Sequence, residues 1–180
     1  ATLVSLEWRA AQIEASLKNL SPVKGRMDVL RQAGRPTIVV DYAHTPDALA
    51  KALSAVQEHF PEQHISCVFG CGGDRDPSKR PVMGQIASRF ADRIMLTTDN
   101  PRSENPKQII SDIMSGVKSS NSTSIPNRKE AIRHAVSHAT SEDLVLIAGK
   151  GCEKYQLEGD RKTAFCDKNI AEKALSELLC

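Results

Sequence analysis

Apolar and polar positions follow two periods along the chain, which predict strands and helices in turn. Short apolar runs rich in β-branched residues predict buried strands, and apolar positions three or four residues apart predict amphipathic helices. Strands are expected at 37–41, 65–69, 93–97 and 144–148. Helices are expected at about 47–59, 80–90, 106–117, 127–139 and 169–179. Such strands, separated by helices, predict an α/β, Rossmann-like fold with a mostly parallel sheet covered on both faces.

The first residues form a different unit from the rest. Apolar positions recur at helical spacing over 1–19, and the Ser-Pro-Val-Lys-Gly-Arg stretch at 21–26 is typical of a turn or linker. We therefore expect 23–180 to be one domain, preceded by this helix and its linker at 1–22. The start has neither a signal-peptide pattern nor an initiator methionine, so we expect part of a longer protein.

Composition narrows the range of partners. The 180 residues include 24 basic and 22 acidic side chains, a formal net charge of +2, so we expect neither nucleic acid nor membrane as a partner. The apolar runs are shorter than the roughly 20 residues of a membrane helix. Five cysteines, an odd number, favour a reducing compartment, and we expect a cytoplasmic protein. Cysteine and histidine spacings match no zinc motif, and we expect no metal site in this chain.

Unusual residues gather where the predicted strands end. Ligands of parallel α/β sheets bind outside the carboxyl ends of the strands. The corresponding loops are 41–47, 70–80, 98–102 and 149–153. We expect a pocket for a zwitterionic small molecule between 70–80 and 99–102. The serine-rich stretch 119–124 is instead expected to be a solvated loop.

The loop at 70–80 begins Gly-Cys-Gly-Gly, which lets the backbone approach a ligand closely. Arg75 stands where a dinucleotide fingerprint needs glycine, which disfavours an NAD-dependent enzyme, and the chain has no phosphate-loop motif. The loop therefore fits either a tight connection or a binding element. Its charged residues, from Asp74 to Arg80, favour binding.

Residues 99–102 (Asp-Asn-Pro-Arg) and Glu153 offer the groups that a zwitterion needs. Arg102 can hold a carboxylate with two parallel hydrogen bonds, while Asp99, Asn100 and Glu153 can receive an ammonium. By itself the 99–102 motif also fits a helix-capping turn, and Glu153 fits an ordinary surface glutamate.

Further candidates lie on the loop after the first predicted strand and among the cysteines. Asp41 can bind a ribose hydroxyl, and His44 can act as a base, stack on a ligand or simply begin the helix. Cys71 or Cys152 can be a nucleophile, although no histidine is placed near either by the sequence.

Five motifs together resemble the C-terminal domain of the bacterial Mur ligases over about residues 20–175. They lie at 25–27, 41–47, 70–81, 99–102 and 149–153. The resemblance is greatest to members that add the third residue of the peptidoglycan stem peptide. This family has a UDP-sugar domain, a central ATPase and an amino-acid-binding domain, so residues 1–22 would end the ATPase.

The resemblance implies a reaction to which this domain contributes positioning. With Mg²⁺, ATP phosphorylates the D-glutamate carboxylate of UDP-MurNAc-L-Ala-D-Glu, and the amine of the incoming amino acid attacks the acyl phosphate. It assigns no catalytic residue to this domain, and we expect the chain alone to be inactive. Where this chain has Cys152, the family usually has histidine.

The resemblance also implies two groups of ligand residues. Diaminopimelate would contact Arg75, Asp99, Asn100, Arg102, Gly149 and Glu153. The adenine and ribose side of ATP would contact Arg26, Asp41 and His44. The 99–102 motif resembles the form in members that select meso-diaminopimelate: with lysine, an unpaired guanidinium would cost about 1–3 kcal/mol. Two alternatives are a lysine-adding homologue and a non-catalytic module that binds an amino acid or nucleotide.

Overall fold

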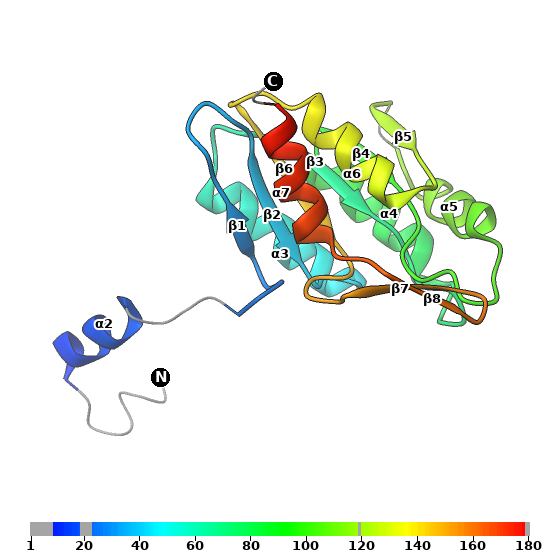
Figure 1. Cartoon of the computed structure of the whole chain (residues 1–180), viewed down its shortest axis with the longest axis horizontal. Coiled ribbons are helices and arrows are strands. Elements are labelled where there is room, and N and C mark those ends of the chain that lie inside the picture. Colours follow the sequence, from blue (N-terminus) through cyan, green and yellow to red (C-terminus); the bar gives the residue numbers. More distant parts are fainter. Residues whose placement is uncertain (1–8, 19–22, 119, 179–180) are drawn as a thin grey trace.

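The computed structural model describes residues 9–18, 23–118 and 120–178, and its centre is a six-stranded sheet (Figure 1). The strand order is β1-β2-β6-β3-β4-β5, and every neighbouring pair is parallel except β1 with β2. The strands are β1 (Asp28–Leu30), β2 (Thr37–Asp41), β3 (His64–Phe69), β4 (Arg93–Leu96), β5 (Ser122–Ser124) and β6 (Asp143–Ala148). The predicted α/β fold with a mostly parallel sheet is confirmed.

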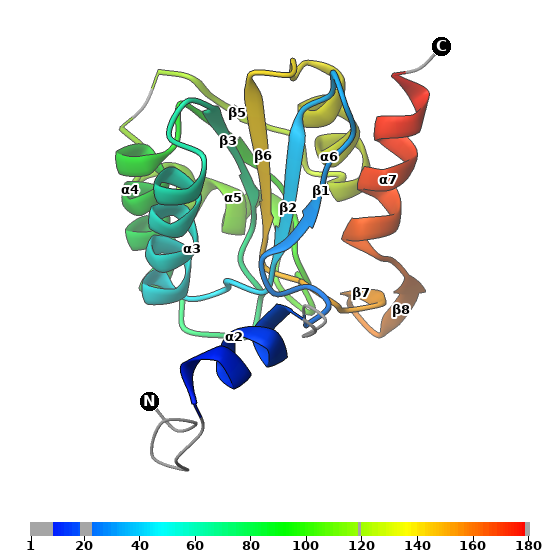
Figure 2. The ribbon, with the colours of Figure 1, turned by 90° about the vertical axis from the view of Figure 1, so that its left-hand side faces the viewer.

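Helices cover both faces of this sheet. Figure 2 shows α3, α4 and α5 on one face and α6 and α7 on the other. Their bounds are α3 (Pro46–His59), α4 (Lys79–Phe90), α5 (Pro106–Met114), α6 (Arg128–Ser137) and α7 (Asp167–Glu177). After α6 the chain inserts β6 between β2 and β3. The connection after β3 leads to α4 on one face, and the connection after β6 leads to α7 on the other face.

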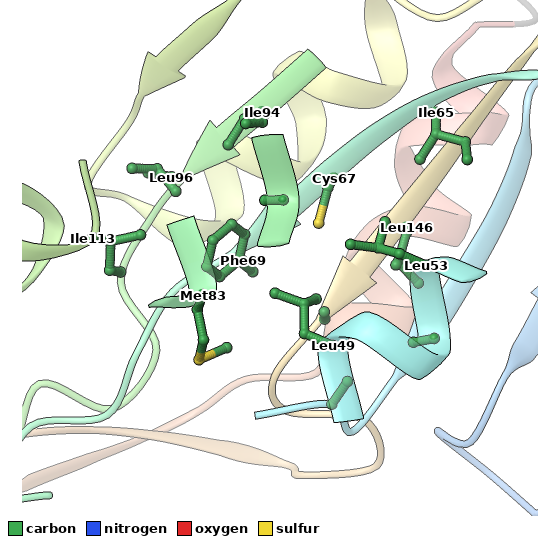
Figure 3. Packing of buried hydrophobic residues seen from close by; sticks show 14 of the residues in the cluster. Leu49, Leu53, Ile65, Cys67, Phe69, Met83, Ile94, Leu96, Ile113 and Leu146 are labelled. Carbon is green, nitrogen blue, oxygen red and sulfur yellow. The ribbon is translucent and has the colours of Figure 1, made fainter. Parts of the chain in front are cut away.

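Two apolar layers result from the alternation of side chains along the central strands. Val39 belongs to the layer under α3 and α4, whereas Ile38 and Val40 belong to the layer under α6 and α7. In the first layer Leu49 of α3 packs near Phe69 of β3, and both are fully buried (Figure 3). Each strand is therefore buried on both sides, which explains its continuous apolar run.

Three strand regions differ from the prediction or were absent from it. Residues Ser122–Ser124 pair with β4, so the interpretation of 119–124 as a solvated loop was wrong for the strand part. β1 and the hairpin of β7 (Tyr155–Glu158) and β8 (Arg161–Ala164) were not predicted. Helix α5 ends at Met114, three residues before the predicted 117.

Helix α2 (Ala10–Lys18) lies within the predicted N-terminal helix, whose remaining residues fall outside the described ranges. Figure 1 shows α2 apart from the sheet and its covering helices. None of the helices in the described ranges is long and apolar enough to cross a membrane.

Candidate functional site

Three loops meet where the chain leaves β3, β4 and β6 at their carboxyl ends. The loop after β3 continues to one face and the loop after β6 to the other, so a crevice between them is the expected place for a ligand. The backbones of the first two loops are in contact: the Gly73 amide donates to the Asn100 carbonyl at 2.9 Å. A Cβ at Gly73 would lie 1.9 Å from the carbonyl oxygen of Pro101, so only glycine permits this approach.

Lys150 joins the loop after β4 to the loop after β6. Its side chain has no exposed surface, and its ammonium donates at 2.9 Å to Asn100 Oδ1 and at 2.9 Å to Glu153 Oε2. The Asn100 amide also donates to Glu153 Oε2, at 3.0 Å. Glu153 Oε1 has no partner among the described residues and is not enclosed, since the side chain is 23% exposed. One carboxylate oxygen is thus fixed and the other is available to a ligand.

Arg102 presents a similar division of its hydrogen-bonding groups. Nη1 donates to the Gly73 carbonyl at 2.7 Å and to the Asn100 carbonyl at 3.3 Å. Within the described part of the chain Nε and Nη2 have no partner, and neither is buried. Their spacing matches the two oxygens of a carboxylate. The guanidinium is therefore held through Nη1, while Nε and Nη2 can bind an anion.

Arg75 lies on the neighbouring loop and is exposed. Its Nη1 donates to the Asp74 carbonyl at 3.0 Å. A Cβ built on Gly72 would approach Arg102 Nη1 to 2.8 Å and Arg75 Cγ to 3.9 Å, so the two arginines flank this glycine. Both arginines belong to the group that the resemblance assigns to diaminopimelate.

The residues described so far form one wall of the crevice, and Asp99 and Gly149 lie on its inner side. This wall comprises Arg75, Asp99, Asn100, Arg102, Gly149, Lys150 and Glu153. Asp99 is 8% exposed, and its carboxylate has no hydrogen-bond partner among the described residues. Gly149 has φ +120°, and a Cβ there would lie 2.8 Å from Asp99 Oδ2. Glycine at this position therefore gives the carboxylate room. An unpaired carboxylate that still reaches solvent suits an ammonium ligand.

Beneath Asp99, Arg128 holds the strand ends together. Its guanidinium makes two 2.8 Å bonds to Asp167, and both side chains are fully buried. It also donates to the Ala148 carbonyl at 2.9 Å and the Thr98 carbonyl at 3.3 Å, at the ends of β6 and β4. Burial alone lowers the pKa of Arg128, but the charge and hydrogen bonds of Asp167, together with the charges of Asp99 and Glu153, outweigh burial and raise the pKa. Arg128 is thus a permanently charged brace.

The charged residues after the glycine loop do not all face a ligand. Arg80 is 2% exposed and donates to Glu104 at 2.7 Å and Asp112 at 2.9 Å. The expectation that Arg80 favours binding was therefore wrong, because it joins α4 to the β4 loop and α5. Asp74 accepts a bond from the hydroxyl of Ser103, which lowers the pKa of its carboxyl.

The predicted ATP residues form a second group. The Arg26 guanidinium lies 4.5 Å from the Tyr42 ring centre, and His44 meets the same ring edge-on at 4.6 Å. Arg26 and His44 are exposed, and a guanidinium beside aromatic rings suits contact with a planar base. The two Asp41 carboxylate oxygens accept the Met27 and Ala43 amides, each at 2.8 Å. The groups are adjacent, since the Gly149 amide donates to the Asp41 carbonyl at 3.1 Å.

We also considered a cysteine nucleophile, a metal site and a second cavity. Burial raises the pKa of the Cys71 thiol to about 12, which argues against its being a nucleophile. In the described ranges no group of three or more histidine, cysteine or acidic residues can hold a metal ion. A cavity of about 810 Å³ lies beside α6 and α7, lined among others by Lys129, Phe165 and Cys152 and by none of the predicted ligand residues.

Residues 25–151 match the family described as Mur ligase, glutamate ligase domain. The chain belongs to the Mur ligase family. Two curated relatives carry the name UDP-N-acetylmuramoyl-L-alanyl-D-glutamate–2,6-diaminopimelate ligase. The protein from Haemophilus influenzae Rd is 47% identical over 171 residues, which are 94% of this chain and 35% of the relative. The protein from Haemophilus ducreyi is 48% identical over 181 residues, 98% of this chain and 36% of the relative.

Solved Mur ligase structures share the fold described above. A structure of a ligase with the same name superimposes with a TM-score of 0.82 at 38% identity, covering 98% of this chain and 36% of the other. The UDP-N-acetylmuramate-alanine ligase of Thermotoga maritima has a TM-score of 0.68 at 15% identity, covering 99% and 35%, a likeness in fold alone. This chain therefore spans about a third of the length of the Mur ligases that it matches.

Sequence reasoning missed two residues of this Mur ligase wall. Lys150 stands between two glycines just after a strand that is apolar from Leu144 to Ala148, and that position could have indicated a buried cation. Gln156, on the unpredicted hairpin, donates to the β4 loop, and nothing in the sequence marks it.

Proposed function

We propose that residues 23–180 are the amino-acid-binding domain of an ATP-dependent ligase that adds meso-diaminopimelate to UDP-MurNAc-L-Ala-D-Glu. Residues 1–22 would then be the end of the central ATPase domain with its linker. One observation carries the proposal: the open donors of Arg102 and the open oxygen of Glu153 lie on one wall, joined through Asn100. The names of the relatives supply the substrate.

In this proposal charged groups of the amino acid meet side chains of opposite charge. Arg102, with Arg75, holds the distal carboxylate, and Glu153 with Asp99 receives ammonium. Gly149 leaves room beside Asp99, and Asn100 fixes Glu153. The site thereby orients the amine that attacks the acyl phosphate, which makes the attack effectively intramolecular.

The nucleotide side of the proposal rests on the second group. The exposed side chains of Arg26 and His44, on either side of the half-buried Tyr42 ring, would contact the adenine and ribose of ATP, and Asp41 would stand at the ribose. ATP and its Mg²⁺ would be held mainly by domains that precede this chain. A structure of the folylpolyglutamate synthase/dihydrofolate synthase from Yersinia pestis, described as complexed with AMPPNP and Mn, shares the fold at a TM-score of 0.61.

Ligation assays on the complete protein test the proposal. With UDP-MurNAc-L-Ala-D-Glu and ATP, we expect ADP release and product formation with meso-diaminopimelate and little with L-lysine. The 180-residue chain alone should form no product. A preference for lysine would assign the lysine-adding activity, and binding without any ligation by the complete protein would indicate a non-catalytic module.

A further inference from the structure

The hairpin of β7 and β8 lies outside the main sheet and contacts the predicted ligand wall. A two-stranded hairpin is marginally stable by itself, so its position depends on what it packs against. Figure 2 shows it at the same end of the sheet as the carboxyl ends of β2 and β6. The Leu157 amide donates to Asn100 Oδ1 at 2.9 Å, so the hairpin bonds directly to a predicted ligand residue.

The hairpin also fixes the backbone of Arg102 on both sides. The Arg102 amide donates to the Leu157 carbonyl at 3.2 Å, and the Gly159 amide donates to the Arg102 carbonyl at 2.7 Å. Arg102 has φ +53°, a left-handed conformation that residues other than glycine rarely adopt. These two bonds hold it there, and the direction of the guanidinium depends on that backbone.

One hairpin side chain secures this arrangement. Gln156 Nε2 donates to the Asp99 carbonyl at 2.7 Å and to Thr98 Oγ1 at 2.9 Å. Thr98 is held in turn, because its hydroxyl donates to the Pro126 carbonyl at 2.8 Å. Gln156 therefore links the hairpin to the loop after β4, at the start of the segment proposed to hold the substrate.

We propose that Gln156 is a positioning residue that keeps the hairpin on the 98–102 segment and so sets the selectivity of Arg102 for an amino acid with a second carboxylate. The selectivity part rests on the proposed function. Gln156 touches no substrate in this scheme. Its two bonds fix the backbone that carries Asp99, and the hairpin bonds then fix Arg102.

Three substitutions separate hydrogen bonding from packing. Gln156→Ala removes both bonds, Gln156→Met keeps the length without a donor, and Gln156→Glu places an acceptor against the Asp99 carbonyl. The matched control is Gln57→Ala on α3, because Gln57 also donates to one carbonyl, that of Phe90 at 3.2 Å, far from this wall in sequence.

Steady-state ligation by the complete protein gives the first readout. For all three Gln156 variants we expect KM for diaminopimelate to rise about tenfold, as two lost hydrogen bonds predict, with kcat within about threefold. The preference for diaminopimelate over lysine should fall about tenfold, and KM for ATP should stay unchanged. Gln57→Ala should match the wild type. An unchanged preference, or equal increases in KM for all substrates, would overturn the proposal.

Hydrogen exchange on the same protein gives a readout that needs no substrate. In Gln156→Ala we expect the Arg102 and Gly159 amides to exchange at least about tenfold faster, and in Gln57→Ala at the wild-type rate. Unchanged protection of both amides refutes the positioning role. If the wild-type protein instead fails to use diaminopimelate, the proposed function fails while the exchange result still decides whether Gln156 positions Arg102.

Discussion

Replacing Lys150 with methionine tests the centre of the ligand wall. The ammonium makes two 2.9 Å bonds, to Asn100 and Glu153, and its side chain has no exposed surface. Removing one partner of a fully buried ion pair costs about 3–5 kcal/mol. Glu153 is 23% exposed and keeps its bond from Asn100, so water and the amide offset part of that cost. We expect Lys150→Met to lower the free energy of unfolding by about 2–3 kcal/mol.

Urea unfolding of this chain measures the effect in a double-mutant cycle. The cycle compares Lys150→Met, Glu153→Gln and the double variant, and we expect an interaction of at least about 1 kcal/mol. The matched control is Lys168→Met, because Lys168 is 35% exposed in its pair with Asp28 and should lose less than about 1 kcal/mol. A loss at Lys150 no larger than that at Lys168, or strict additivity in the cycle, would refute the reasoning.

Three further predictions concern the frame around this wall. Arg128→Met should lower the free energy of unfolding in urea by about 3–5 kcal/mol, and combining it with Asp167→Leu should recover most of that loss. A double variant that loses as much stability as Arg128→Met would contradict the structural role of this ion pair. Burial alone raises the pKa of Asp143, but the hydrogen bonds that it accepts lower it below the usual value. Its stabilising effect is therefore present above about pH 4 and lost as pH falls through the lower folded pKa, so Asp143→Asn should flatten the acid limb of the stability curve, and an unchanged limb would oppose this. With a thiol reagent at pH 8, exposed Cys152 should react and Cys71, whose pKa burial raises to about 12, should not; rapid labelling of folded Cys71 would show the core to be open.

The main strands could be predicted because they are buried on both faces. β2 and β6 are buried along their length, so each is a continuous apolar run apart from Thr37 and Asp41 at the ends of β2 and Asp143 at the start of β6. β5 is a Ser-Thr-Ser edge strand, and no apolar signal marks it. The β7–β8 hairpin is half-exposed and held by bonds to a loop, so its sequence carries no core-facing period.

The candidate site was predictable as a set of loops but not in its internal order. Strand-end geometry and the Mur ligase motifs located Arg102 and Glu153, whose roles as ligand residues stay predictions. The partner of Lys150 at Asn100 is 50 residues away, and only the fold brings them together. Arg80 was misinterpreted for a similar reason: its charge suggested a ligand residue, but its partners Glu104 and Asp112 are 24 and 32 residues away, and they hold it in the interior.

The selectivity of the complete protein for meso-diaminopimelate over L-lysine, measured as the ratio of kcat/KM values before and after Arg102→Ala, tests the central claim most directly. The loss of a charge-assisted carboxylate clamp worth about 1–3 kcal/mol predicts a roughly 5- to 150-fold fall in this ratio. Arg89→Ala, at the far end of α4, should leave the ratio unchanged. An Arg102→Ala protein that keeps the wild-type preference would contradict the assignment of Arg102 to the distal carboxylate.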